Sequence, residues 1–232
     1  MSRRTRANEV GPYFTDDRSD LARFLAKRGI SFGGCVLEVG CAAGAAGPQW
    51  RMLGAATLEG IEPFPPAAEA ASASGVYDAV HCGTFENWVP RYPPYDAVIF
   101  ADVLEHLADP TEALHRVHAV LARPSGKLVL SLPNVRHISV LADLLFRGDW
   151  QYRPAGMLDE THLRFFTRRS GARLLQETGF RQEAFGRYGS LRASRLLATL
   201  WPWLGEFLLS ELFLVAAPVL ASSQRQGAAE EA

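Results

Sequence analysis

The sequence has 232 residues, of which 48% are hydrophobic and 21% are charged, so it is long enough for one α/β domain with a sizeable core. Its formal net charge of -1 argues against broad nucleic-acid binding. The three cysteines, Cys35, Cys41 and Cys82, form no C-x-x-C pair, which favours a reduced cytoplasmic setting over a disulfide framework. The polar N-terminus does not resemble a signal peptide.

Three segments differ in composition. We expect a flexible N-terminal segment over residues 1–18, a single domain over 19–220 and a flexible tail over 221–232, because both ends are polar and no linker interrupts the middle. Internal repeats are absent from the sequence.

Helical and strand-like patterns alternate through the first half of the domain. Residues 19–28 place apolar side chains at helical spacing, and residues 35–39 form a short apolar run that is typical of a buried strand. A turn of small residues follows this run. We predict further strands over 56–62, 76–82 and 95–100, with helices over 48–53 and 66–74 between them.

The second half opens on a strong helix start. In the run Asp109-Pro110-Thr111-Glu112, the aspartate can cap, the proline suits the first helical position, and the glutamate completes a capping box. Thr167 is expected to cap a later helix that Gly179 ends. An irregular segment over about 135–166, with one helix over 139–146, is expected to form a substrate lid. The remaining predicted strands span 127–132, 180–188 and 211–217.

Residues 196–220 form an apolar stretch that raises the question of a membrane span. Four residues interrupt it, namely Pro202, Glu206, Glu211 and Pro218. These make it a poor spanning helix, so we expect no stable membrane insertion and interpret the stretch as a core helix, a turn and a last strand. A peripheral membrane contact through Trp201 and Trp203 is the alternative.

Strands that alternate with helices predict a Rossmann-like, doubly wound α/β fold with a mostly parallel sheet covered on both faces. Ligands in such sheets bind outside the carboxyl ends of the strands. The turn over residues 40–44, Glu62, Thr84 and Asp102 all follow or end predicted strands. We therefore expect them to meet in one crevice.

The glycine pattern of the turn distinguishes between two kinds of nucleotide ligand. A dinucleotide site needs G-x-G-x-x-G, but the turn here reads Gly40-Cys41-Ala42-Ala43-Gly44-Ala45-Ala46-Gly47, without the middle glycine. Glu62 ends the next strand, where a carboxylate can accept hydrogen bonds from both hydroxyls of a ribose. The pattern thus favours a ribose-bearing ligand and disfavours a dinucleotide oxidoreductase. A tight turn with no ligand, and a solvated Glu62, are the plain alternatives.

Several motifs resemble one enzyme family in order and spacing. Residues 36–44 resemble the first motif, E/D-x-G-x-G-x-G, of the class I S-adenosylmethionine-dependent methyltransferases, and Gly60-Ile61-Glu62-Pro63 resembles their ribose-binding acidic motif. Residues 95–107, which contain Asp102-Val103-Leu104-Glu105-His106, resemble their fourth motif. Pro133-Asn134 and residues 159–167 resemble a bacterial branch related to ubiquinone-biosynthesis O-methyltransferases and to sugar and natural-product methyltransferases.

The resemblance implies a seven-stranded sheet with an antiparallel last hairpin, S-adenosyl-L-methionine as cofactor, and cofactor contacts by position. Glu38 would hold the turn and the methionine end, Glu62 and Pro63 the ribose, and Thr84 and Phe85 the adenine. The other implied contacts are Gly40, Cys41, Ala42 and Gly44 in the turn, Phe100, Ala101 and Val103 near the sulfonium, and Tyr13 closing over the cofactor.

Two departures from the family pattern matter. Ala42 stands where a glycine is usual, which an L-residue tolerates only with suitable backbone angles, and Thr84 stands where an acidic residue usually binds the adenine amino group. These departures favour the alternative of a methyltransferase-like partner subunit without activity. The main expectation is O-methylation of a small molecule such as a natural product, sugar or phenol, with N-methylation as a further alternative.

Three histidines are candidates for the base that removes a proton from a hydroxyl acceptor: His106, His137 and His162. His106 follows the fourth strand, whereas the other two lie in the predicted lid. Structural roles remain open for each of them, and packing is favoured for His162. Glu105 could bind a metal, but the sequence shows no full ligand set, so we predict none. We expect a small-molecule substrate, no nucleic acid, and a monomer or homodimer.

Overall fold

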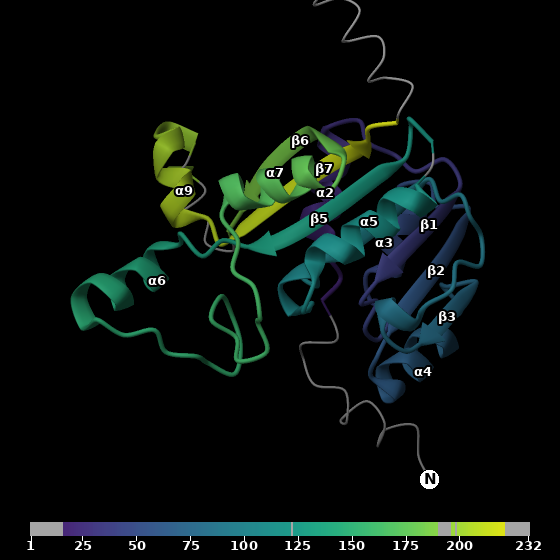
Figure 1. The fold of residues 1–232 in the computed structure, drawn as a ribbon, viewed down its shortest axis with the longest axis horizontal. Coiled ribbons are helices and arrows are strands. Elements are labelled where there is room, and N and C mark those ends of the chain that lie inside the picture. The colour runs from purple at the N-terminus through teal and green to yellow at the C-terminus, as the bar shows by residue number, and fades with distance from the viewer. Residues whose placement is uncertain (1–15, 122, 190–195, 198, 221–232) are drawn as a thin grey trace, which may run out of the picture.

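The computed structural model describes residues 16–121, 123–189, 196–197 and 199–220, and its centre is a seven-stranded sheet in the order β3-β2-β1-β4-β5-β7-β6 (Figure 1). The strands from β3 to β5 pair in parallel, while β7 runs antiparallel to both β5 and β6. Their bounds are β1 Cys35–Val39, β2 Thr57–Glu62, β3 Ala79–Cys82, β4 Ala97–Ala101, β5 Lys127–Pro133, β6 Phe180–Tyr188 and β7 Glu211–Pro218. The predicted fold class is confirmed.

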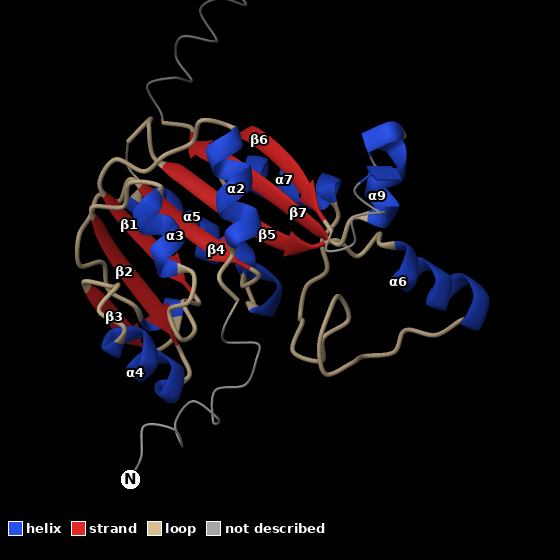
Figure 2. Cartoon of the chain, turned by 180° about the vertical axis from the view of Figure 1, so that it is seen from behind, coloured by secondary structure: helices blue, strands red, loops and turns tan. Residues whose placement is uncertain are grey.

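Helices cover both faces of the sheet, as Figures 1 and 2 show from opposite sides. One face carries α2 (Ser19–Lys27), α3 (Gly47–Met52) and α4 (Pro65–Ala73), and the other carries α5 (Pro110–Val120) and α7 (Arg168–Glu177). Successive residues of each strand point to opposite faces, so β4 sends Val98 into the core with α5 and Ile99 into the core with α2. Because helices cover both faces, a ligand is expected to bind at the edge of the sheet where the parallel strands end.

Capping residues fix where the two helices of the second face begin. The Asp109 side chain accepts a hydrogen bond from the Glu112 amide at 2.9 Å, and Pro110 occupies the first turn of α5. Thr167 and Ser170 form a reciprocal capping box at the start of α7, and Gly179 follows that helix with φ +82°. The predicted starts of both helices are confirmed, although the full capping box belongs to Thr167 and not to Asp109.

Two helical arms interrupt the regular βα pattern. The first lies between β5 and α7 and consists of α6 (Ile138–Ala142) and a π-helical turn, η4 (Asp143–Arg147). The second lies between β6 and β7 and contains η5 (Pro202–Leu204) and α9 (Gly205–Leu208). No helix in the described part of the chain is long and apolar enough to cross a membrane.

The prediction of a core helix within residues 196–220 is wrong. Leu196 is 61% exposed, Leu200 60% and Trp203 65%, whereas the predicted last strand is buried. The reason lies in the sheet, because Phe24 of α2 packs on β7 from one face and α7 packs on it from the other. No apolar face of β7 remains for a further helix to cover.

Candidate functional site

The turn after β1 is shaped by close contacts that only glycine permits. Gly40 has φ +74°, and a Cβ built on it would lie 2.5 Å from a methyl group of Val103. The amides of Gly40 and Cys41 both donate to the Ile61 carbonyl, at 2.8 and 3.0 Å, which fastens the turn to the end of β2. Gly44 also has a positive φ, of +86°. The first predicted motif is therefore a tight turn at the carboxyl edge of the sheet.

Ala42 adopts the left-handed conformation that the sequence made a condition for the turn. Its φ is +49°, a value that usually costs an L-residue about 1–3 kcal/mol. The Ala42 amide donates to Glu62 Oε2 at 2.9 Å, so a charge-assisted hydrogen bond to the next strand offsets the strain. Ala42 thus occupies the place of a glycine by virtue of its partner on β2.

Glu62 is held by two backbone amides at the end of β2. It is 4% exposed, and its two carboxylate oxygens accept from the amides of Ala42 and Phe64, each at 2.9 Å. Burial raises the pKa of Glu62, and these two hydrogen bonds oppose that rise. Each carboxylate oxygen can accept about two hydrogen bonds, so each retains capacity for about one more besides the bond from its amide.

Glu38 is a buried carboxylate beneath the same turn. It is 2% exposed and accepts a hydrogen bond from the Tyr77 hydroxyl at 2.6 Å. Burial raises the pKa of Glu38 from its ordinary value of 4.5 to about 7, although the Tyr77 hydrogen bond and the positive charge of Arg18 favour the ionised form. The turn therefore rests on a group that titrates near neutral pH.

This titration predicts a pH-dependent stability. Between about pH 4.5 and about pH 7 the folded chain keeps the Glu38 proton while the unfolded chain has lost it, so the free energy of unfolding falls as the pH rises through this window. A glutamine can still accept from Tyr77 but does not titrate. We expect Glu38→Gln to gain up to about 3 kcal/mol relative to the wild type between about pH 4.5 and about pH 8, measured by urea unfolding at a series of pH values.

The exposed carboxyl of Glu69 on α4 offers a control for that measurement. Glu69→Gln should follow the pH dependence of the wild type. If Glu38→Gln also follows it, Glu38 does not titrate in this window.

Arg18 reaches over the carboxyl end of β4, a contact that the sequence did not predict. Its Nη1 donates to Asp102 Oδ2 at 2.6 Å and its Nη2 donates to the Ala101 carbonyl at 3.2 Å, while the Ser131 hydroxyl donates to the other oxygen of Asp102. Burial disfavours the guanidinium, but Asp102 more than compensates and the pKa of Arg18 stays above its ordinary value. This ion pair fixes the Arg18 side chain at the carboxyl end of β4.

Other residues that the sequence assigned to the cofactor lie around this edge with different exposures. Phe100 is fully buried and Ala101 is 7% exposed at the end of β4. Phe85 is 3% exposed and packs edge-on against Phe100, so its ring belongs to the core. Thr84 is exposed just before it, as is Pro63 after β2. Tyr13 lies outside the described residues.

Cys41 has the character of a packing residue. It is 2% exposed, and a Cβ on Gly60 would lie 2.7 Å from its sulfur atom. Burial and the nearby Glu38 and Glu62 raise the pKa of the Cys41 thiol, which disfavours a nucleophilic thiolate.

The fold brings two of the three candidate histidines together. The ring centroids of His106 and His162 are 4.7 Å apart in an edge-on arrangement, and His106 Nδ1 lies 3.0 Å from the Thr161 hydroxyl and 3.3 Å from its carbonyl. Burial, with the neighbouring His162, lowers the pKa of His106. His137 instead caps α6, where its Nδ1 lies 2.9 Å from the Ser139 hydroxyl.

Glu105 completes this cluster from beneath. It is 1% exposed, neither of its carboxylate oxygens has a hydrogen-bond partner, and Oε1 lies 4.0 Å from His162 Nε2. Burial and the negative charge of Asp102 raise the pKa of Glu105. Within the described residues, Glu105, His106 and His162 each bring one ligand atom within 4.8 Å of the others, a set that could hold a metal ion. The sequence prediction of no metal rested on seeing no such set, because His162 is remote in the chain.

The strand order of the sheet, together with a matching family model, shows a class I S-adenosylmethionine-dependent methyltransferase. A family model described as a methyltransferase domain matches residues 13–184. The chain belongs to this methyltransferase family, and its cofactor is S-adenosyl-L-methionine.

The curated relatives match only part of this chain. The ubiquinone biosynthesis O-methyltransferase of Sodalis glossinidius is 35% identical over 114 residues, which cover 47% of this chain and 45% of that protein. A tRNA 5-carboxymethoxyuridine methyltransferase of Escherichia coli strain K12 is 35% identical over 94 residues, 39% of this chain and 35% of that protein. The chain spans about half the length of the first curated relatives it matches.

Solved structures share the fold at low sequence identity. The S-adenosylmethionine-dependent methyltransferase of Mesorhizobium loti has a TM-score of 0.58 at 19% identity, covering 84% of this chain and 97% of its own. A methyltransferase in complex with the Haloferax volcanii Trm112 activator has a TM-score of 0.63 at 15% identity, covering 90% of each chain. The sheet order is thus that of known methyltransferases.

Proposed function

We propose that this chain transfers a methyl group from S-adenosylmethionine to a hydroxyl oxygen of a small molecule. The observation that carries the proposal is the imidazole of His106, which lies just past the end of β4 with one ring nitrogen engaged by Thr161. The curated relatives named as O-methyltransferases support an oxygen acceptor.

The residues at the carboxyl edge fit the chemistry of the cofactor. A ribose offers two hydroxyl donors, which match the acceptor capacity that Glu62 retains, and the turn at Gly40 exposes backbone without a side chain. The cofactor supplies an electrophilic methyl group on a positively charged sulfur atom. The carboxylate of Asp102 at the same edge is half-buried and pairs with Arg18. Arg18, which pairs with Asp102, is the cation that lies nearest to this edge in the proposed site.

The chain itself must orient the acceptor and take up its proton. Thr161 fixes the orientation of the His106 ring, and the lowered pKa of His106 keeps the imidazole neutral at pH 7 and able to accept a proton. His162 packs edge-on against His106, and Glu105 lies behind it. In this assignment His162 and Glu105 position the base.

The amino-acid composition bears on the acceptor class, the compartment and the oligomeric state that we propose. The net charge of -1 supports a small-molecule acceptor over a nucleic acid, and three free cysteines in the described structure suit a cytoplasmic enzyme acting as a monomer or homodimer.

Two measurements test the proposal in order. Isothermal titration with S-adenosylmethionine and with S-adenosylhomocysteine should show binding, and a panel of phenols, catechols and sugars should release S-adenosylhomocysteine with at least one hydroxyl acceptor. Absence of cofactor binding at millimolar concentration would remove the enzyme reading altogether. Binding with turnover of amines alone would replace oxygen by nitrogen as the acceptor.

A further inference from the structure

Exposed apolar side chains are concentrated in one part of the molecule. Within the described residues, the large hydrophobic side chains that are exposed outside residues 138–203 are Met52, Phe64 and Val89. The others lie on or between the two helical arms, and they are Ile138, Leu144, Leu145, Phe146, Trp150, Tyr152, Leu163, Leu196, Leu197, Leu200, Trp201 and Trp203. A concentration of exposed apolar side chains on a folded domain marks a surface that binds another molecule or a membrane.

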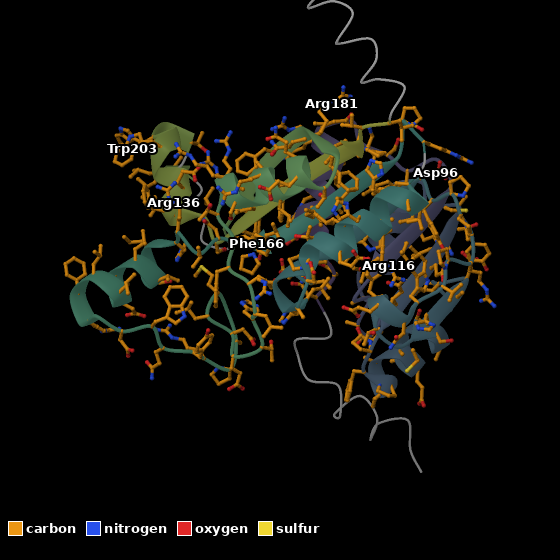
Figure 3. All side chains as sticks on the ribbon, viewed as in Figure 1. Asp96, Arg116, Arg136, Phe166, Arg181 and Trp203 are labelled. Carbon is orange, nitrogen blue, oxygen red and sulfur yellow. The ribbon has the colours of Figure 1, made fainter. Side chains whose placement is uncertain are left out.

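Both arms project from the same side of the molecule. Figures 1 and 2 show α6 and α9 beyond the carboxyl end of β5, outside the layers that cover the sheet. We define the first arm as residues 138–147 and the second as residues 196–208. Figure 3 shows Trp203 on the outer side of the second arm and Arg136 near its base. Strongly exposed apolar side chains sit on both arms, with Phe146 86%, Leu145 74% and Trp203 65% exposed.

A buried asparagine holds the second arm beside the start of the first. Asn134 is fully buried at the end of β5, and its side-chain amide donates to the carbonyls of Glu206 at 3.0 Å and Leu209 at 2.9 Å. The Arg136 guanidinium lies 4.7 Å from the centre of the Phe207 ring. These contacts fix the base of the second arm to the segment that leads into the first.

Each arm has one carboxylate, and arginines on or beside the arms pair with it. The first arm has one carboxylate, Asp143, whose side chain is 14% exposed and pairs with Arg147 at 73% and Arg153 at 48% exposure. The second arm has one carboxylate, Glu206, at 17% exposure. It is surrounded by Arg136, Arg168 and Arg187, at 39%, 51% and 20% exposure. Of these arginines, Arg147 and Arg168 are more than half exposed, whereas Arg187 is mostly covered. The segment between the arms also has two exposed carboxylates, Asp149 and Glu160.

We propose that the two arms dock this enzyme on an anionic lipid surface. Apolar tips with two tryptophans suit the boundary between acyl chains and head groups, and arginines at the base of such tips lie where lipid phosphates are. Tryptophan is favoured at this boundary because its ring is apolar and its N–H is polar. The docking is peripheral, since the described chain has no helix that could cross a bilayer.

Docking would also orient the candidate site. Both arms leave the sheet at the carboxyl end of β5 and the neighbouring ends of β6 and β7, the edge at which β4 presents Asp102 and His106. A membrane against the arms would therefore face the same edge as the crevice. The inference does not depend on the proposed reaction, because lipid binding by the arms requires neither cofactor nor acceptor.

Vesicle flotation of the full chain tests the proposal. Vesicles of phosphatidylcholine alone are compared with vesicles of equimolar phosphatidylcholine and phosphatidylglycerol. We expect binding to the anionic vesicles, weakened by added salt. Trp201→Ser with Trp203→Ser should lower the partition coefficient about tenfold or more, since two large apolar groups no longer enter the interface. Arg147→Gln should lower it about fivefold, the effect of one cation near an anionic surface.

Matched controls lie on the body of the domain. Met52 and Val89 are 74% and 78% exposed but far from the arms in sequence, so Met52→Ser and Val89→Ser should bind vesicles like the wild type. Circular dichroism and S-adenosylhomocysteine binding verify that each variant folds. The proposal is overturned by absence of binding to anionic vesicles, by equal binding to both vesicle types, or by arm variants that bind like the wild type. It is also overturned if the chain is an oligomer that does not bind vesicles and the tryptophan substitutions dissociate it, because the arms would then contact a second copy of the chain.

Discussion

His106→Ala is expected to lower kcat by about 10²–10⁴-fold while leaving the affinity for S-adenosylhomocysteine unchanged, because general-base catalysis contributes about that much. The ring lies past the end of β4, where Thr161 orients it and His162 packs against it. Steady-state kinetics with a hydroxyl acceptor identified in the panel, and titration with S-adenosylhomocysteine, separate the two quantities. Added imidazole should restore part of the lost rate, since it replaces the missing proton acceptor.

The other histidines provide the comparison. His137 caps α6 and is expected to be dispensable, so His137→Gln should retain the rate of the wild type. If His137→Gln loses the rate and His106→Ala keeps it, the base lies in the lid. The cluster with Glu105 adds a second discrimination, because loss of wild-type activity on chelation, without rescue of His106→Ala by imidazole, would assign His106 to a metal ion instead.

Glu62→Ala is expected to weaken binding of S-adenosylmethionine by about 10²-fold or more, because hydrogen bonds from two hydroxyls to a carboxylate contribute about 1.5–3 kcal/mol each. Glu62 also accepts from the amides of Ala42 and Phe64, so its removal releases the left-handed turn as well. Glu62→Gln keeps one acceptor oxygen and should fall between the variant and the wild type. Isothermal titration measures both.

Glu59 offers a control for destabilisation without loss of the site. It lies in the same strand, is 3% exposed, and accepts from the Trp88 indole at 3.0 Å and from the Tyr95 hydroxyl. Glu59→Gln replaces a carboxylate that is as deeply buried as Glu62, but it should leave cofactor affinity nearly unchanged. If Glu62→Gln and Glu59→Gln lose cofactor affinity equally, this would falsify the assignment of Glu62 to the ribose.

Local patterns were sufficient for most of the fold. The strand over residues 180–188 and the starts of α5 and α7 follow from apolar runs and capping residues, which act within a few residues of the chain. The third strand is shorter than the prediction of 76–82, because it begins at Ala79. The apolar stretch after residue 196 gave a wrong prediction. Whether such a stretch is buried depends on whether any face of the sheet is still uncovered, which a local pattern does not show.

The candidate site divides in the same way. Glu38, Gly40, Ala42 and Glu62 are adjacent to strand ends, and their meeting at one edge follows from parallel strand order. Arg18 with Asp102, and His162 with Glu105, are separated by long stretches of chain and approach through side chains. No local pattern distinguishes such pairs from ordinary surface charge or packing. The departure at Ala42 was visible in the sequence, but its left-handed angle and its Glu62 partner were not.

The alanine at the centre of the glycine turn has a consequence for cofactor binding in the site that we propose. A glycine there would let the free turn sample many conformations, and binding would have to order them at a cost in affinity. Ala42 instead holds a single uncommon conformation that β2 enforces through Glu62. The ordering is completed when the chain folds. In the proposed cofactor site, the left-handed backbone of Ala42 costs free energy at folding, and binding of the cofactor then loses less conformational entropy.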